Sequence, residues 1–130
     1  MYLRFVVTKN GQRSPKELGI FHAFLDLRDD GKLYPYEEDQ HNLIRQWFNE
    51  HLERPTRFTA SKPPYYRKQN RAICWFKDSA HEHLEWAWWM AAILENHQIP
   101  VQMLKVERVG YVVYEDEYQI VAQPFAKTRR

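Results

Sequence analysis

The chain has one cysteine, four glycines and no long apolar run in its 130 residues, and each shortage excludes a class of protein. Cys74 alone cannot form an intrachain disulfide, which favours a reducing compartment. Four scattered glycines exclude a glycine-rich phosphate-binding loop. No window reaches the roughly 18 apolar residues of a spanning helix. The apolar start of the chain is short and interrupted by Arg4, unlike a signal peptide. We therefore expect a cytoplasmic protein that does not enter membranes.

Aromatic residues are abundant, at 15% of the chain, with five Trp, eight Tyr and seven Phe. The length is that of one domain and is sufficient to bury a core without disulfides or metals. We interpret residues 1–130 as a single domain with an aromatic-rich core. The alternative for the aromatic residues is an aromatic-lined ligand site.

Hydrophobic periodicity predicts an α+β fold in the order strand, helix, helix, loop, strand, helix and three strands. The predicted helices are residues 14–29, 35–53 and 79–97. The predicted strands are residues 2–7, 72–77, 101–108, 111–114 and 118–123. We expect a small mixed sheet of four or five strands, with C-terminal antiparallel hairpins and about three helices packed against it. If the strands at 72–77 and 101–108 share a sheet, the helix between them should make them parallel.

Local signals mark the ends of these helices. Ser14, Pro15 and Glu17 form a capping pattern that predicts the first helix start, and Gly31 is placed to end that helix. Ser79 and Glu82 have the spacing of a capping box for the third helix.

The apolar faces of the second and third helices follow from helical spacing. The face predicted for the second helix comprises Tyr36, Leu43, Ile44, Trp47, Phe48 and Leu52. The third helix is apolar nearly all round, which predicts a central position. The residues expected to face the sheet are Leu84, Trp88, Ala91 and Leu94. An alternative is that Trp86, Trp88 and Trp89 contribute to a homodimer interface.

Basic charge gathers in an irregular, proline-containing loop at residues 54–71, which has six basic residues and no acidic one. Residues 126–130, which we expect to be a frayed tail, add three more. The rest of the chain then carries −7, although the whole has a formal charge of +2. Clustered Lys and Arg attract phosphates, and tyrosines stack on bases. The predicted contact residues are Arg57, Lys62, Tyr65, Tyr66, Arg67, Lys68 and Arg71.

A second group of polar residues precedes and begins the third helix. His81 and Glu85, four residues apart, lie on one helical face, whereas His81 and His83 do not. His81 and Glu85, together with Asp78 and Arg71, form a candidate acid–base site in which His81 or His83 is the candidate general base. The spacing is not that of a helical zinc motif, so we predict no metal site and no cofactor.

These observations favour a non-catalytic binding or interaction module that uses the loop at 54–71. The expected partner is an acidic protein or a second copy of the chain, in preference to nucleic acid, because the overall pI near 8.7 is only moderately basic. The alternatives are a small enzyme with its site at the start of the third helix, and a structural subunit or homodimer that packs through the tryptophan-rich helix.

Overall fold

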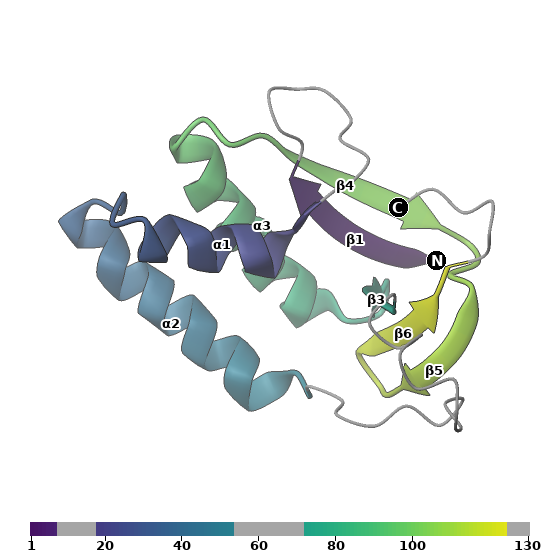
Figure 1. The fold of residues 1–130 in the computed structure, drawn as a ribbon. Helices are drawn as coiled ribbons and strands as arrows, with labels where there is room; N and C mark the ends of the chain where they lie inside the picture. Colours follow the sequence, from purple (N-terminus) through teal and green to yellow (C-terminus); the bar gives the residue numbers. More distant parts are fainter. Residues whose placement is uncertain (8–17, 54–71, 125–130) are drawn as a thin grey trace, which may run out of the picture.

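A computed structural model describes residues 1–7, 18–53 and 72–124, which form a sheet with three helices on one side (Figure 1). The helices are α1 (Ile20–Asp29), α2 (Pro35–His51) and α3 (His81–Asn96). The strands are β1 (Tyr2–Val7), β2 (Leu18–Gly19), β3 (Ile73–Lys77), β4 (Val101–Val106), β5 (Tyr111–Glu115) and β6 (Gln119–Gln123). The α+β single domain and its element order are confirmed, with the two-residue β2 as an addition.

Strand β1 organises the sheet. One of its edges pairs along its whole length with β4. The other edge is shared, because Tyr2 and Leu3 pair with β3 whereas Val6 and Val7 pair with β2. Strand β3 then pairs with β6, and β6 with β5.

Every pairing among the described strands is antiparallel, so the expected mixed sheet is wrong in this respect. The reason is that β1 lies between β3 and β4. Both strands run antiparallel to β1, and they are therefore parallel to each other without being hydrogen-bonded neighbours. Helix α3 crosses over the intervening strand.

The start of α1 differs from the prediction. Leu18 and Gly19 pair with Val7 and Val6, so the helix begins only at Ile20. The capping pattern proposed for residues 14–17 lies outside the described residues. Gly31 is confirmed as the residue that ends this helix, with φ +68°, and its N–H donates to the carbonyl of Arg28 at 2.9 Å.

The buried stripe of α2 differs from the one predicted. Tyr36 and Leu43 are exposed, which corrects the expectation, whereas Ile44 and Phe48 are buried as expected. The stripe is completed by Glu37 and His41, which are both fully buried polar residues. Its members are therefore four, three and four residues apart, an ordinary helical spacing that includes polar side chains.

Helix α3 begins at His81 after Ala80, which has no capping side chain, so the predicted Ser79 capping box is wrong. A tight turn, in which the N–H of Ala80 donates to the carbonyl of Lys77, shifts the helix start past Ser79. Ala91 and Leu94 are buried as expected.

The prediction that Trp88 belongs to the core is wrong, because 49% of its surface is exposed. Leu84, which we expected beside it, is partly buried against the core. Trp86 and Trp89 are also partly buried there, between the helices.

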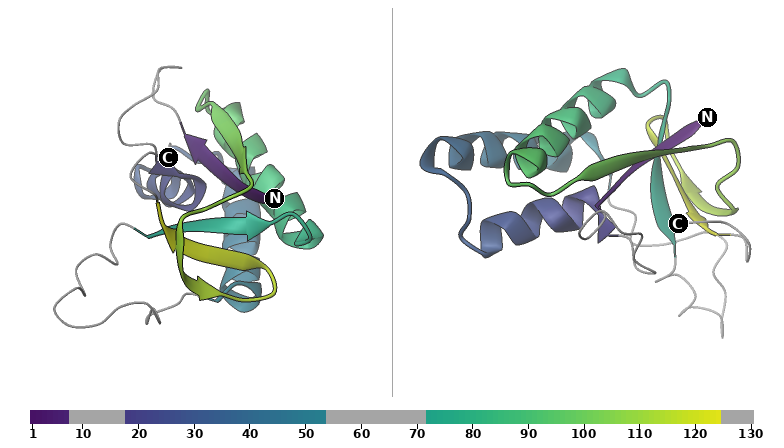
Figure 2. Two further views of the ribbon diagram at one scale, coloured as in Figure 1. Left: turned by 90° about the vertical axis from the view of Figure 1, so that its right-hand side faces the viewer. Right: turned by 90° about the horizontal axis from the view of Figure 1, so that it is seen from above.

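Figure 2 shows the three helices together on one side of the strands. Two apolar clusters lie on opposite faces of the sheet. The larger cluster joins the helices to Phe5 and Phe76, and the smaller one surrounds Trp75. Trp75 and Phe76 are neighbours on β3, so the strand is covered on both faces there, as its apolar run predicts. Cys74, one residue earlier, is exposed.

Gly110 makes the bend from β4 into β5. Its φ is +123°, and a Cβ atom at this position would collide with the carbonyl oxygen of Gln123. Only glycine fits there, so the gap predicted between the strands at 101–108 and 111–114 has a backbone cause.

Candidate functional site

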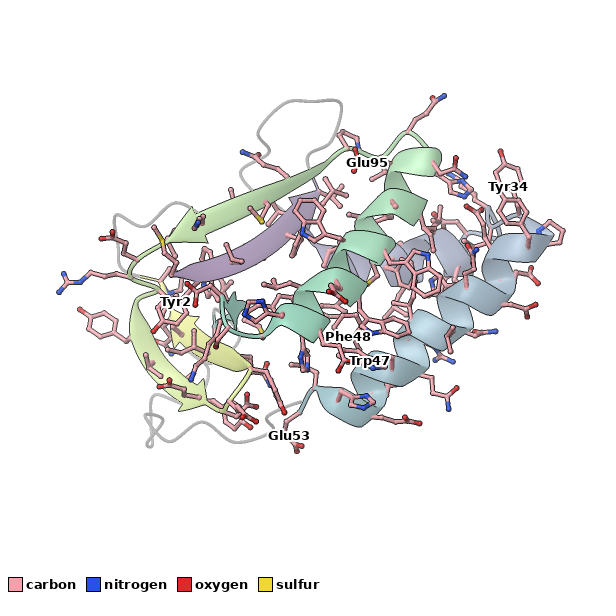
Figure 3. The ribbon with its side chains drawn as sticks, turned by 180° about the vertical axis from the view of Figure 1, so that it is seen from behind. Tyr2, Tyr34, Trp47, Phe48, Glu53 and Glu95 are labelled. Atoms are coloured by element: carbon pink, nitrogen blue, oxygen red, sulfur yellow. The ribbon has the colours of Figure 1, made fainter. Side chains whose placement is uncertain are left out.

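A groove of about 440 Å³ lies where the end of α2 meets the start of α3. It is lined by Glu50 and His51 from α2, Ser79 and Ala80 from the preceding turn, His81, Glu82 and His83 from α3, and Tyr118 from the β5–β6 turn. In Figure 3 the labels of Trp47 and Glu53 mark the end of α2 that borders this groove. It is the larger of the two described cavities and the one with more titratable side chains.

His83 joins the two helices at the groove. It is 4% exposed, and its Nε2 lies 2.7 Å from the carbonyl oxygen of His51. Because a carbonyl only accepts hydrogen bonds, this nitrogen carries the proton and Nδ1 is left with a lone pair in the neutral ring. His51 has the opposite arrangement, since its Nδ1 donates to the carbonyl of Trp47 at 2.8 Å.

Aromatic rings hold both histidines in place. Tyr118 stacks on His83 with ring centroids 4.3 Å apart, and Trp47 meets the same ring edge-on at 4.7 Å. His51 stacks on Trp47 at 4.4 Å. Each of the two histidines is therefore held by one hydrogen bond to a backbone carbonyl and by at least one ring contact.

A hydrogen-bond network beside the groove, centred on the buried Gln119, holds Glu53, the residue that precedes the segment 54–71. Gln119 is 1% exposed, and its Nε2 donates to the carbonyl of Glu53 at 2.7 Å and to Asp116 Oδ2 at 3.0 Å. Asp116 also accepts hydrogen bonds from the Tyr114 hydroxyl and from the backbone N–H of Tyr118. The β5–β6 turn thus holds the end of α2 through one amide side chain.

The hydrogen bonds at Asp116 control its ionisation. Burial acts to raise the pKa of Asp116, but the hydrogen bonds from Gln119, Tyr118 and Tyr114 lower it overall. The same hydrogen bond to Asp116 raises the pKa of Tyr114 to about 12. The network therefore combines one carboxylate with neutral donors.

Cys74 completes this network, because its Sγ donates to Gln119 Oε1 at 3.0 Å. Its side chain is exposed, yet desolvation raises the pKa of the thiol to about 12. The hydrogen bond to the buried amide of Gln119 also favours the neutral thiol. The hydrogen bond and the raised pKa therefore indicate that Cys74 is a structural cysteine and not a reactive one.

A separate polar cluster lies at the other end of the helices. Glu37 Oε1 lies 2.6 Å from His97 Nε2 and also accepts a hydrogen bond from the backbone N–H of Tyr34, and Glu37 Oε2 accepts one from the Asn96 side chain. Burial acts to raise the pKa of Glu37, but these hydrogen bonds lower it overall. The cluster joins the start of α2 to the end of α3.

His41, on the same helix, is also buried. Its Nε2 donates to the carbonyl of Phe24 at 2.8 Å, and its Nδ1 has no partner. Desolvation lowers the pKa of His41, so the ring is neutral. Both residues stabilise the packing of the helices and lie away from the groove.

Of the predicted acid–base residues that the structure describes, the two candidate general bases lie at the groove. His81 and His83 line it, whereas Asp78 and Glu85 are not among its lining residues. Asp78 instead lies 3.4 Å from the amino group of Met1. Arg71 and the predicted contact residues Arg57, Lys62, Tyr65, Tyr66, Arg67 and Lys68 lie outside the described residues.

Sequence reasoning missed His51 and Tyr118 among the groove residues, whereas His83 was already a candidate general base and has a local signal of its buried position. His83 is four, seven and eleven residues from Ala87, Met90 and Leu94, which are all buried, so it belongs to the inner stripe of α3. His51 and Tyr118 carry no such local signal.

Within residues 1–7, 18–53 and 72–124, no three His, Cys, Asp or Glu side chains are grouped so as to hold a metal ion. In the same part of the chain, no helix has the length and apolar character needed to cross a membrane. Comparison with family models, with curated proteins and with solved structures finds no match to this chain.

Proposed function

We propose that this domain is a non-catalytic binding module that contacts an acidic surface, foremost that of a protein partner, through the basic segment 54–71. The observation that carries the proposal is the separation of charge between the described scaffold and the segments attached to it.

The scaffold is strongly acidic. The described residues include 16 of the 17 acidic residues but only seven of the 19 basic ones, a formal charge of −9. The remaining segments, 8–17, 54–71 and 125–130, therefore carry +11. A scaffold of this charge repels polyanions, so an acidic partner is attracted only by these segments.

The register of the strands indicates that these three segments join the sheet at the same end. Ile73 pairs with Ala122, so the start of β3 and the end of β6 lie together. Because β1 is antiparallel to β3, the end of β1 lies toward the same end of the sheet. Segment 8–17 leaves from that end of β1, 54–71 enters β3 there, and 125–130 follows β6. Positive charge is thus attached repeatedly at one end of the sheet.

The enzyme alternative has less support. Of the described groups with shifted pKa values, only Tyr118 lines the groove, and a hydrogen bond with Glu117 raises the pKa of that tyrosine. A raised pKa makes a tyrosine a poorer acid and leaves it protonated at neutral pH. His51 and His83 each use one ring nitrogen to bond a backbone carbonyl, which is a structural role.

The test is a fluorescence titration at low salt with three labelled probes: a glutamate-rich peptide, single-stranded DNA and single-stranded RNA. We expect binding of the acidic peptide, and loss of most of that binding when Arg67, Lys68 and Arg71 are replaced together by Ala. A matched variant that replaces Lys32, Arg45 and Arg108 on the scaffold removes the same charge and should leave the affinity nearly unchanged. Absence of binding to all three probes would refute the proposal.

The identity of the preferred partner follows from a further substitution. Replacing Tyr66 by Ala removes a ring that can stack on a base, which is worth about 1–3 kcal/mol per base in single-stranded complexes. If only nucleic acid binding weakens in this variant, and nucleic acid binds more tightly than the peptide, the partner class is nucleic acid instead of protein.

A further inference from the structure

We propose that the outer edge of β4, together with Trp88 and Met103, is a docking surface for a second copy of this chain, through antiparallel pairing of the two β4 strands about Met103. This inference is independent of the segment 54–71.

Strand β4 offers an open edge. All six of its residues pair with β1 on one side, and none of the strands described here pairs with its other side. Edge strands present unpaired N–H and C=O groups, and most proteins protect them with prolines, bulges or several charges. Strand β4 has no proline and no register shift against β1, and its one charged residue is Lys105. By contrast, β5 is interrupted by a register shift between Val112 and Tyr114.

An apolar strip follows this edge. Met103 is the register partner of Phe5, so both side chains lie on the helical face of the sheet. Trp88 meets the Phe5 ring edge-on at 4.9 Å. Trp88 is 49% exposed and Met103 37%, although both are next to a fully buried phenylalanine. Large apolar side chains exposed beside an unpaired edge indicate a contact surface.

The edge is complementary to itself. A two-fold axis normal to the sheet at Met103 places this residue opposite its own copy, Val101 opposite Lys105, and Gln102 opposite Leu104. Directly opposed like charges are absent from this register. An axis at Lys105 would place two ammonium groups opposite each other, which is unfavourable.

Charge also supports this arrangement. In the Met103 register, Lys105 of one copy lies next to Val101 of the second copy. The last turn of α3 leads into that end of β4 and carries Glu95, which is exposed (Figure 3). The carboxylate and the negative end of the helix dipole there both attract an ammonium group. A two-fold axis forms this contact twice.

Sedimentation velocity over a wide range of protein concentrations tests the proposal. We expect a reversible dimer, and an increase of about tenfold or more in its dissociation constant for Met103→Glu, which opposes two carboxylates at the axis. Because Met103 is partly exposed, the monomer should remain folded, which circular dichroism checks. Tyr36→Glu, at an exposed aromatic residue on α2, is the matched control and should dimerise like the native protein.

Two further measurements test the register. An equal mixture of Met103→Glu and Met103→Lys should dimerise better than either variant alone, because opposite charges then meet at the axis. In a Cys74→Ser background, Met103→Cys should form an intermolecular disulfide readily, and Tyr36→Cys should not. A chain that is monomeric at every concentration, or a dimer that Met103→Glu does not weaken, would overturn the proposal. Neither result affects the proposed role of residues 54–71.

Discussion

Replacing Gln119 by Met should destabilise the domain by about 2–4 kcal/mol, although the two side chains have similar volumes. The Gln119 amide gives one hydrogen bond to the carbonyl of Glu53 and one to the carboxylate of Asp116. A neutral hydrogen bond contributes about 0.5–1.5 kcal/mol to stability, and one to a charged group about 1.5–3 kcal/mol. Removing the donor costs more when the acceptor left behind is buried than when water can bond to that acceptor. Gln119 is 1% exposed and Asp116 is partly buried, whereas Glu53 is exposed, so water can replace the lost donors only in part.

Urea unfolding followed by tryptophan fluorescence measures this change. Gln46→Met is the control, because the Gln46 amide bonds the exposed Glu50 on the surface of α2, and its loss should cost no more than about 0.5 kcal/mol. Gln119→Glu separates packing from hydrogen bonding, since it keeps the shape but turns a donor into an acceptor beside Asp116. This variant should be less stable than Gln119→Met at pH 7 and should recover partly in acid. A loss below about 0.5 kcal/mol for Gln119→Met would refute the reasoning.

Three other predictions concern single residues. Burial lowers the pKa of His41 below its ordinary 6.5, so as the pH falls the unfolded chain binds a proton at this histidine before the folded chain does. The stability that the neutral ring contributes should therefore be complete above pH 6.5 and decrease below it. In His41→Gln, which keeps a hydrogen-bond donor for the carbonyl of Phe24, the melting temperature should depend less on pH between about pH 6.5 and 5. Gly110→Ala should cost at least about 2 kcal/mol in urea unfolding, because a positive φ and a backbone collision act together, and a loss near zero would mean that the bend relaxes. The thiol of Cys74 should react with iodoacetamide at pH 8 much more slowly than free cysteine, since its pKa is about 12, and rapid labelling would show that the thiol is not held by Gln119.

Periodicity and backbone chemistry predicted most of the fold. The strand and helix order, the start of α2 at Pro35 and the role of Gly31 all depend on short-range rules that the tertiary structure does not override. The start of α1 is an exception, because Leu18 and Gly19 are taken up by pairing with β1. That pairing is a long-range interaction, and local capping signals contain no information about it.

Burial was predicted less well, because the predicted faces of the second and third helices contained only apolar and aromatic residues. Trp88 and Tyr36 are exposed, whereas Glu37, His41 and His83 are buried. These three polar residues lie on the helical stripes of their buried neighbours, so position, and not residue type, gave the better indication. Their burial is compatible with stability because each one has a hydrogen-bond partner on another element.

The groove could not be predicted from sequence. Its histidines come from α2 and α3, and Tyr118 comes from a turn far away in the chain. Only the packing of the sheet on the helices brings these elements together. His81, Asp78 and Glu85 were grouped because they are close in sequence, but of these three only His81 lies at the groove.

The salt dependence of binding tests the central claim, that residues 54–71 attract an acidic ligand, most directly. Labelled single-stranded DNA serves as a polyanion of regular charge, and each phosphate neutralised contributes about −0.7 to the slope of log affinity against log salt. Replacing Arg67, Lys68 and Arg71 together by Ala should flatten that slope by about two units, whereas replacing Lys32, Arg45 and Arg108 on the acidic scaffold should leave it unchanged. Equal slopes for the native chain and the Arg67, Lys68 and Arg71 variant would contradict the account.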